Sequence, residues 1–167
     1  AMLDYIVAAI MLLAGINFAL YYQLTKGRFR AIKEDVELRV FVTLKLILVI
    51  FTAWNLIGHE IVSTSGAIIE RAGFGEALRY ATFATFTFQT GTGFCNADYD
   101  LWPATSKALL MAFAFIGGCG GSTAGGVKVI RFWIAIKVML AQLEKAYRPS
   151  VVRPIHIGGS KVGADGT

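Results

Sequence analysis

A short run of small and hydroxyl-bearing residues near the middle of the chain could bind a cation through its backbone. Residues 90–94 read Thr-Gly-Thr-Gly-Phe. Gly91 and Gly93 tolerate backbone angles that a Cβ atom forbids, so the run can extend with successive carbonyl oxygens pointing the same way. Such a row of oxygens can replace the water shell of a metal cation. The run therefore predicts cation binding without catalytic chemistry.

A second stretch, residues 117–126, predicts a loop inside an otherwise apolar region. It holds six glycines, and each glycine lowers helix stability by about 1 kcal/mol relative to alanine. Non-helical backbone is tolerated at membrane depth only against protein or a water-filled cavity, so we expect this stretch to lie against a pore. Movement between two arrangements would open or block that pore. A static helix kink is the alternative.

Two basic residues follow this stretch closely. Lys128 and Arg131 lie two and five residues after Gly126. A charge at that depth is unfavourable in lipid, so we expect both side chains to face water or a carboxylate. They would either hold the loop and exclude cations when it is closed, or anchor the following segment at the cytoplasmic surface.

The sequence offers no set of catalytic residues. It lacks paired carboxylates, a Ser/His/Asp set and a metal-ligand cluster, and its two cysteines are too isolated for a disulfide framework. The glycine-rich stretch resembles a phosphate-binding loop, but Val127 separates Gly126 from Lys128 and no Ser or Thr follows that lysine. We therefore expect a protein that is not an enzyme and carries no covalently bound cofactor.

Composition indicates that lipid forms part of the solvent around these motifs. Of 167 residues, 56% are hydrophobic and 16% are charged, whereas soluble domains carry about 25% charged residues. Lys and Arg number 16 against 11 Asp and Glu. These basic residues flank apolar runs instead of forming a stripe, so membrane topology explains them better than nucleic-acid binding.

Three apolar segments predict helices that would position the motifs. Residues 5–22 form an uncharged run that covers about 27 Å as a helix, close to the thickness of a hydrocarbon core. A second helix is expected at about residues 38–58, with Lys45 reaching toward water along its own aliphatic stem. A third begins near Ala104. Residues 104–143 would measure about 60 Å as one helix, so the glycine-rich stretch must break it.

The segment before the Thr-Gly run is uncharged but too polar to face lipid. Residues 82–88 read Thr-Phe-Ala-Thr-Phe-Thr-Phe, a largely alternating pattern that could form a strand. An open strand edge in hydrocarbon would leave every backbone group unpaired, so a short buried helix at about residues 76–88 is favoured. The C-terminal end of that helix would carry roughly half a negative charge and would favour a cation.

The distribution of basic residues predicts the topology. Six lie between the first and second helices, seven follow the glycine-rich stretch and three lie between the second and third helices. By the positive-inside rule the six and the seven face the cytoplasm. The short helix then enters from outside and returns there, as a re-entrant pore helix would.

These motifs resemble a known family. Residues 89–94 (QTGTGF), 96–99 (NADY), 102–103 (WP) and 115–131 (FIGGCGGSTAGGVKVIR) are similar to the Trk/Ktr/HKT superfamily of potassium transporters, and within it to the bacterial Trk potassium-uptake membrane subunit. Residues 13–20 resemble the helix that closes that family's second repeat. Family members carry four helix–pore–helix repeats around one pore, so the chain is identified as a fragment that covers the end of the second repeat and the third repeat.

The resemblance implies an all-α membrane protein whose last helix is broken by a glycine loop. Residues 1–25 would be the transmembrane helix closing the preceding repeat, 26–37 a cytoplasmic loop, 38–142 the complete repeat and 143–167 a cytoplasmic linker. The implied filter positions are Thr90, Gly91, Thr92 and Gly93. The implied gate positions are Gly117, Gly118, Gly120, Gly121, Ser122, Thr123, Gly125 and Gly126, with Lys128 and Arg131 beside them.

The expected function is uptake of potassium, as substrate, across the bacterial inner membrane by a multi-pass protein. The implied partners are the remaining repeats, a second copy in a homodimer, a cytoplasmic nucleotide-binding regulatory subunit and the lipid bilayer, with no nucleic acid. Two alternatives stay open. One is a sodium-preferring transporter of the same architecture, and the other is a non-conducting membrane assembly module.

Overall fold

The chain is mostly helical, as expected. The computed structural model describes residues 2–147, 155–157 and 160–162. Its helices are α1 (Met2–Ala14), α2 (Phe18–Thr25), α3 (Phe29–Glu34), α4 (Val36–Leu56), α5 (Phe74–Thr90), α6 (Ala104–Ala114) and α7 (Val129–Tyr147), with a 3₁₀ turn, η1 (Tyr99–Leu101). Two antiparallel hairpins that the sequence did not predict pair β1 (Ile61–Val62) with β2 (Ile68–Ile69) and β3 (Ile155–Ile157) with β4 (Ser160–Val162).

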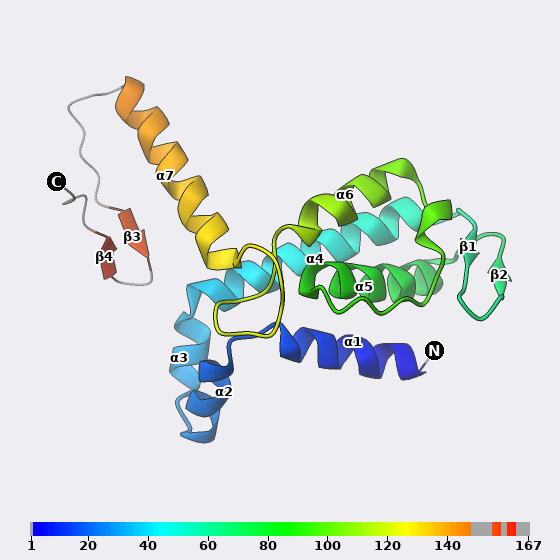
Figure 1. The fold of residues 1–167 in the computed structure, drawn as a ribbon, viewed down its shortest axis with the longest axis horizontal. Coiled ribbons are helices and arrows are strands. Elements are labelled where there is room, and N and C mark those ends of the chain that lie inside the picture. The colour runs from blue at the N-terminus through cyan, green and yellow to red at the C-terminus, as the bar shows by residue number, and fades with distance from the viewer. Residues whose placement is uncertain (1, 148–154, 158–159, 163–167) are drawn as a thin grey trace.

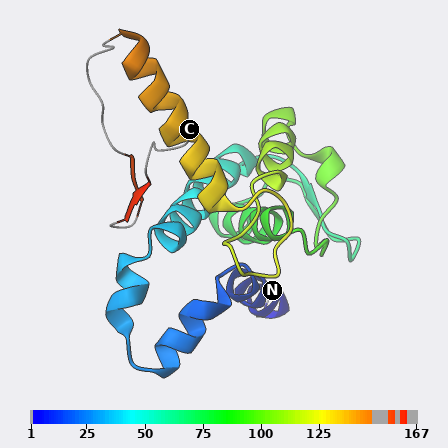
Figure 2. The same cartoon turned by 60° about the vertical axis from the view of Figure 1, so that its left-hand side comes forward.

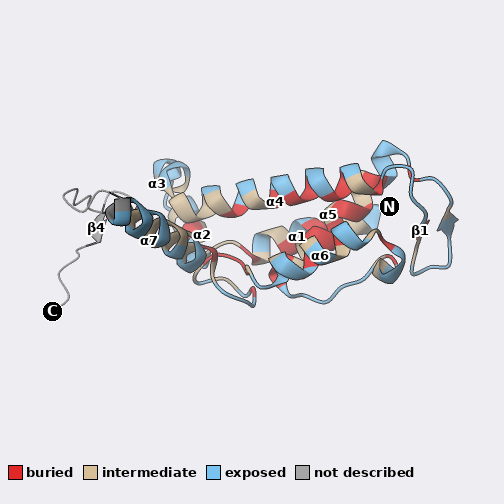
Figure 3. Cartoon of the chain, turned by 90° about the horizontal axis from the view of Figure 1, so that it is seen from above, coloured by how far each residue is buried: buried red, intermediate tan, exposed pale blue. Residues whose placement is uncertain are grey.

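Helix α5 lies at the centre of the packed part of the molecule. It contacts α4, α1 and α6 (Figure 1). Ala77, Ala81 and Ala84 are completely buried along it, and such small side chains let neighbouring helices approach closely. Figure 3 shows that buried residues concentrate on α5 and on the face of α4 that meets it. Helices α2, α3 and α7 project away from this bundle (Figures 1 and 2).

The polar segment before the Thr-Gly run is helical, as predicted, but longer than expected. The helix spans Phe74–Thr90, against the expected residues 76–88. The Glu76 carboxylate accepts a hydrogen bond from Gly73 N–H at 3.1 Å and caps the start. The Thr82 and Thr90 hydroxyls each donate to the carbonyl four residues earlier, both at 2.7 Å. These internal bonds explain how a threonine-rich helix can be buried.

The prediction of one straight helix over residues 5–22 is wrong. Helices α1 and α2 meet at a bend of 92°. Asn17 caps the start of α2, and its side-chain oxygen accepts a hydrogen bond from Ala19 N–H at 2.9 Å. A Cβ atom on Gly15 would lie 2.8 Å from the Phe41 ring. The cap and this close approach to α4 fix the bend.

The second and third predicted helices are present. Helix α4 begins after Asp35, whose side chain accepts a hydrogen bond from Leu38 N–H at 2.7 Å. It ends at Leu56, two residues before the predicted end. Helix α6 begins at Ala104, and the apolar stretch that follows breaks after Ala114 and resumes as α7 at Val129. The prediction that glycines interrupt this stretch is confirmed.

By length and apolar content, one pair of described helices could cross a membrane, namely α1 and α2 taken together across their bend. Among the described helices no single one meets that measure, and α6 is apolar but short.

Candidate functional site

The Thr-Gly run (residues 90–93) begins where α5 ends. Thr90 is the last helical residue, so the prediction that it starts an extended segment is wrong. Gly91 follows with φ 68° and ψ 26°, a left-handed conformation that glycine adopts without steric penalty. The N–H groups of Gly91 and Thr92 both donate to the Thr87 carbonyl, at 3.0 and 3.2 Å. The chain therefore turns sharply before it leaves the helix.

Three threonine hydroxyls gather at this turn. Thr92 Oγ1 lies 3.2 Å from Thr87 Oγ1 and 3.4 Å from Thr90 Oγ1. The same hydroxyl donates to Met11 Sδ at 3.0 Å, which ties the turn to α1. Thr87 and Thr90 are buried, whereas residues 91–95 are exposed. The backbone of residues 91–93 is thus exposed, and the threonine hydroxyls beneath it hold it in place.

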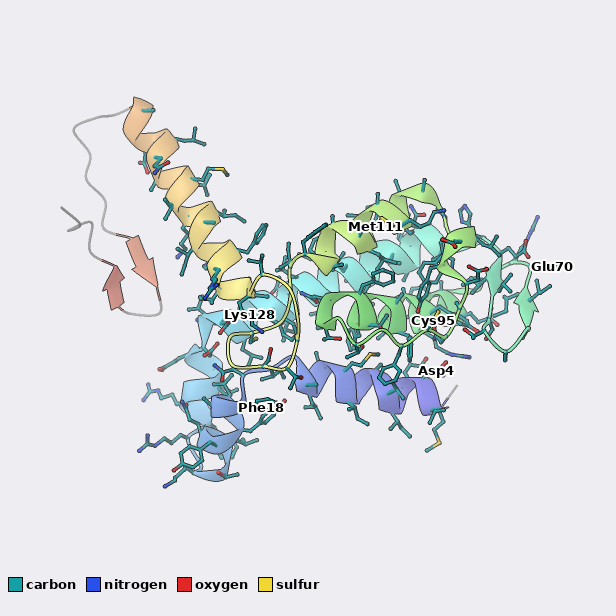
Figure 4. All side chains as sticks on the ribbon, in the orientation of Figure 1. Asp4, Phe18, Glu70, Cys95, Met111 and Lys128 are labelled. Carbon is teal, nitrogen blue, oxygen red and sulfur yellow. The ribbon has the colours of Figure 1, made fainter. Side chains whose placement is uncertain are left out.

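A hollow lies beside the exposed part of the run. Its volume is about 370 Å³. The residues that line it are Thr87, Phe88, Gly91, Gly93, Phe94, Cys95 and Tyr99. Figure 4 shows Cys95 on the segment that returns along α5. Two of the four predicted filter residues, Gly91 and Gly93, therefore border an open space in the described part of the chain.

The glycine loop (residues 117–126) packs against the bend between α1 and α2. Cys119 N–H donates to the Gly15 carbonyl at 3.0 Å, and Phe18 N–H donates to the Gly121 carbonyl at 3.1 Å. The Thr123 hydroxyl donates to the Ala14 carbonyl at 3.0 Å. Backbone groups that a continuous helix would pair internally are thus paired between the break at the α1–α2 bend and the break between α6 and α7.

The loop is so tight that one of its glycines leaves no room for a side chain. A Cβ atom on Gly117 would lie 1.7 Å from the Gly125 carbonyl oxygen. Beside it, Gly117 N–H donates to the Val127 carbonyl and Val127 N–H donates to the Phe115 carbonyl, both at 2.9 Å. These bonds close the base of the loop and bring its two ends together.

The structure brings the two predicted site elements into contact. Gly125 N–H, in the glycine loop, donates to the Thr90 carbonyl oxygen at 3.3 Å. An ideal Cβ atom on Gly91 would lie 3.8 Å from the same nitrogen. The loop therefore rests directly on the C-terminal end of α5, where the helix dipole is negative.

Of the two basic residues after the loop, Lys128 contacts it. Its ammonium group donates to the Ala124 carbonyl at 2.6 Å and to the Ser122 carbonyl at 3.4 Å, and Figure 4 places Lys128 beside the loop. Its hydrogen-bond partners among the described residues are backbone oxygens and include no carboxylate. Arg131 has an exposed side chain on α7.

Sequence reasoning missed one residue that touches the loop. The Glu37 side chain, in the first turn of α4, accepts a hydrogen bond from Gly120 N–H at 2.6 Å. Glutamate is common in the first turn of a helix, so its sequence signal indicated a helix start and nothing more. No local pattern connects it to a glycine 83 residues away.

The expectation that Lys45 reaches water is wrong. Its residue is 2% exposed. Its ammonium group lies 4.2 Å from the centre of the Phe86 ring and 4.9 Å from that of Phe41. Helix α5 covers this face of α4, so the lysine stem has no free path to the surface.

Comparisons with known proteins agree on one family. The TrkH family profile, described as cation transport protein, matches residues 1–165. The Trk system potassium uptake protein TrkH of Escherichia coli K12 is 33% identical over 154 residues, which cover 92% of this chain and 30% of that protein. TrkG of the same organism is 26% identical over 162 residues, covering 96% of this chain and 31% of TrkG.

A solved structure of the same kind has a similar fold. The crystal structure of the potassium transporter TrkH from Vibrio parahaemolyticus superimposes with a TM-score of 0.81 at 28% identity, covering 94% of this chain and 32% of that chain. The chain thus spans about a third of the length of the relatives it matches. These relatives are transporters and not enzymes. The chain belongs to the TrkH family of cation transport proteins.

Proposed function

We propose that this chain forms part of a potassium-conducting pore, with the Thr-Gly run as one strand of its selectivity filter and the glycine loop as its gate. The observation that carries the proposal is the contact between these elements, the hydrogen bond from Gly125 N–H to the Thr90 carbonyl. This bond joins a loop made of small residues to the end of the buried helix α5, at the point where the exposed backbone of residues 91–93 begins.

The filter role follows from the electrostatics of the helix end. The C-terminal carbonyls of α5 carry a partial negative charge, and the exposed backbone of residues 91–93 continues from them. Left-handed angles at Gly91 and Gly93, with φ of 68° and 78°, turn the peptide groups of this run away from the helical path. Their oxygens are then free to face an ion instead of an N–H group.

The gate role follows from how the loop is held. Its contacts are mostly single hydrogen bonds to carbonyls at the α1–α2 bend and at the end of α5, so a small displacement breaks several of them together. Lys128 bonds to the loop's own carbonyls and would move with it. Withdrawal of the loop from Thr90 would open a path below the run.

The complete pore requires more than this chain, because the chain spans about a third of its relatives. We place it as the end of the second repeat and the third repeat of a multi-pass inner-membrane protein. The remaining repeats would supply the other filter strands. Homodimeric assembly and a cytoplasmic nucleotide-binding regulatory subunit complete the proposal.

The test is a flux assay on a full-length family member that carries this segment, with Gly93→Ala as the variant. Gly93 has φ +78° and no atom within 4 Å of an ideal Cβ, so alanine strains the backbone without a collision. Gly58, which follows α4, has the same φ and the same open space, and Gly58→Ala is the matched control. We expect Gly93→Ala to reduce the preference for potassium and rubidium over sodium, and Gly58→Ala to leave it unchanged.

Three outcomes would contradict the proposal in different ways. Unchanged selectivity in Gly93→Ala would remove the filter assignment. A preference for sodium in the unaltered protein would mean that sodium, and not potassium, is the substrate. Absence of any cation flux would favour a non-conducting assembly module.

A further inference from the structure

The contact between Glu37 and Gly120 joins the start of α4 to the glycine loop. Glu37 Oε1 accepts the Gly120 N–H at 2.6 Å, a short bond of the kind that an ionised acceptor makes. An ideal Cβ atom on Gly120 would lie 3.5 and 3.6 Å from the two carboxylate oxygens. The carboxylate therefore lies against the loop backbone at van der Waals distance.

The described residues give Glu37 no competing cation. The carboxylate makes no ion pair with a described lysine or arginine, whereas Arg30 pairs with Glu34 and Arg79 pairs with Asp4. The carboxylate of Glu37 is partly buried, and the N–H of Gly120 is the hydrogen-bond donor that this part of the chain offers it. The Gly120 N–H therefore bonds to a carboxylate. In a continuous helix it would bond to a backbone carbonyl.

The other contacts of the loop differ in kind. Its bonds to Ala14, Gly15 and Thr90 use backbone carbonyls as acceptors, and Lys128 bonds to carbonyls of the loop itself. Among the described residues, Glu37 is the charged side chain that reaches the loop from outside its own sequence neighbourhood. Removing it would take away a short bond to a charged group without altering the loop's own residues.

A buried thiol next to this bond reports on the loop. Cys119 precedes Gly120 and is 0% exposed. It packs with Phe41 and Val129, so the thiol is covered as long as the loop stays in place. Departure of the loop from α4 would uncover it.

We propose that Glu37 is a positioning residue that latches the glycine loop against α4, and that loss of its carboxylate releases the loop. The latch itself depends only on the contact described above. Its consequence for transport rests on the proposed function, since a released loop increases flux only where the loop is a gate.

The test measures how fast Cys119 reacts with a maleimide in a full-length family member that carries this segment. Cys95 and the cysteines outside the segment are replaced by serine. Glu37→Ala should raise the rate at least about tenfold, the factor expected for a lost hydrogen bond to a charged group. Glu37→Gln retains an acceptor oxygen and should give an intermediate rate. Glu34→Ala is the matched control, because Glu34 is exposed and pairs with Arg30, and it should leave the rate unchanged.

A second reporter separates loop release from unfolding. Ser106 is 0% exposed in α6, and Ser106→Cys is nearly isosteric, so it places a thiol in the helical bundle. In a chain carrying Ser106→Cys and Cys119→Ser, the latch predicts no reaction with or without Glu37→Ala. Protection of Cys119 in Glu37→Ala would overturn the latch, and so would joint exposure of both reporters, because the bundle itself would then have opened.

Cation flux of the same variants tests the gate role of the loop separately from the Glu37 latch. Higher basal flux in Glu37→Ala together with exposed Cys119 supports both. Exposed Cys119 with unchanged flux supports the latch and contradicts the gate role of the loop.

Discussion

At the scale of single residues, the site depends on glycines whose missing side chains are required for different reasons. Gly91 supplies a left-handed turn with φ 68° at the end of α5. Gly117 supplies space, because a Cβ atom there would meet the Gly125 carbonyl oxygen at 1.7 Å. From the sequence alone, both positions are simply glycines, and the two reasons cannot be told apart. Which of the two reasons applies depends on residues that fold against each position.

The difference between Gly117 and Gly125 gives a paired prediction. Gly117→Ala must displace backbone, so we expect it to lower the free energy of unfolding by about 1–3 kcal/mol, as overpacking does. Gly125 has no atom within 4 Å of an ideal Cβ and no positive φ, so Gly125→Ala should change stability by less than about 0.5 kcal/mol. Thermal unfolding of both variants in the same detergent measures the difference. Equal stability of the two would mean that the loop does not adopt this closed arrangement.

At the scale of elements, one ion pair holds α1 against the start of α5. Arg79 Nε donates to Asp4 Oδ2 at 2.7 Å, and the two side chains are 24% and 18% exposed. This pair fixes the end of α1 that lies away from the bend, while Met11 contacts the threonine cluster nearer the bend. Helix α1 is therefore bonded to α5 near one end and to the turn that follows α5 near the other.

This pair predicts a measurable contribution to stability. Asp4→Asn keeps the size of the side chain and removes its charge, and should lower the free energy of unfolding by about 1 kcal/mol, since the pair is largely shielded from water. The control is Glu34→Gln in the pair with Arg30, whose side chains are 71% and 91% exposed. Glu34→Gln should lower the free energy of unfolding by less than about 0.5 kcal/mol. A control effect as large as that of Asp4→Asn would refute the assignment.

The elements also show what could be predicted from the sequence and what could not. The ends of α5 and the break after α6 were predictable within a few residues, because capping groups and clustered glycines act locally. The bend between α1 and α2 was not, because in addition to the local Asn17 cap it is stabilised by Phe41 and by loop residues far along the chain. The surroundings of Lys45 were misjudged, and the contact of Glu37 was missed, for the same reason. Their surroundings come from α5 and the glycine loop, which no local pattern places beside them.

At the scale of the whole molecule, residues 91–93 of the Thr-Gly run lie exposed at the surface of the described part of the chain. Residues 91–95 are exposed beside the 370 Å³ hollow, although they follow one of the most buried helices. A filter strand would have this surface if the remaining repeats of the pore lie opposite it. The chain covers 30% of E. coli TrkH, which leaves ample length for those repeats.

The native Cys95 tests whether this surface faces an aqueous path. Cys95 is exposed and borders the same hollow as Gly91 and Gly93. In the full-length protein, a positively charged thiol reagent added from outside should abolish most of the cation flux, because the bound positive charge would repel cations at the mouth of the filter. Cys95→Ser should protect the flux. A thiol that is fully modified without any loss of flux would place the run away from the pore.

The most direct test of the account locates the ion itself. Rubidium replaces potassium in a crystal of the full-length protein, and its anomalous signal marks where it binds. We expect rubidium density on the pore axis, within coordination distance of the carbonyl oxygens of residues 90–93. Rubidium density confined to other sites, with acyl chains packed against this run, would contradict it.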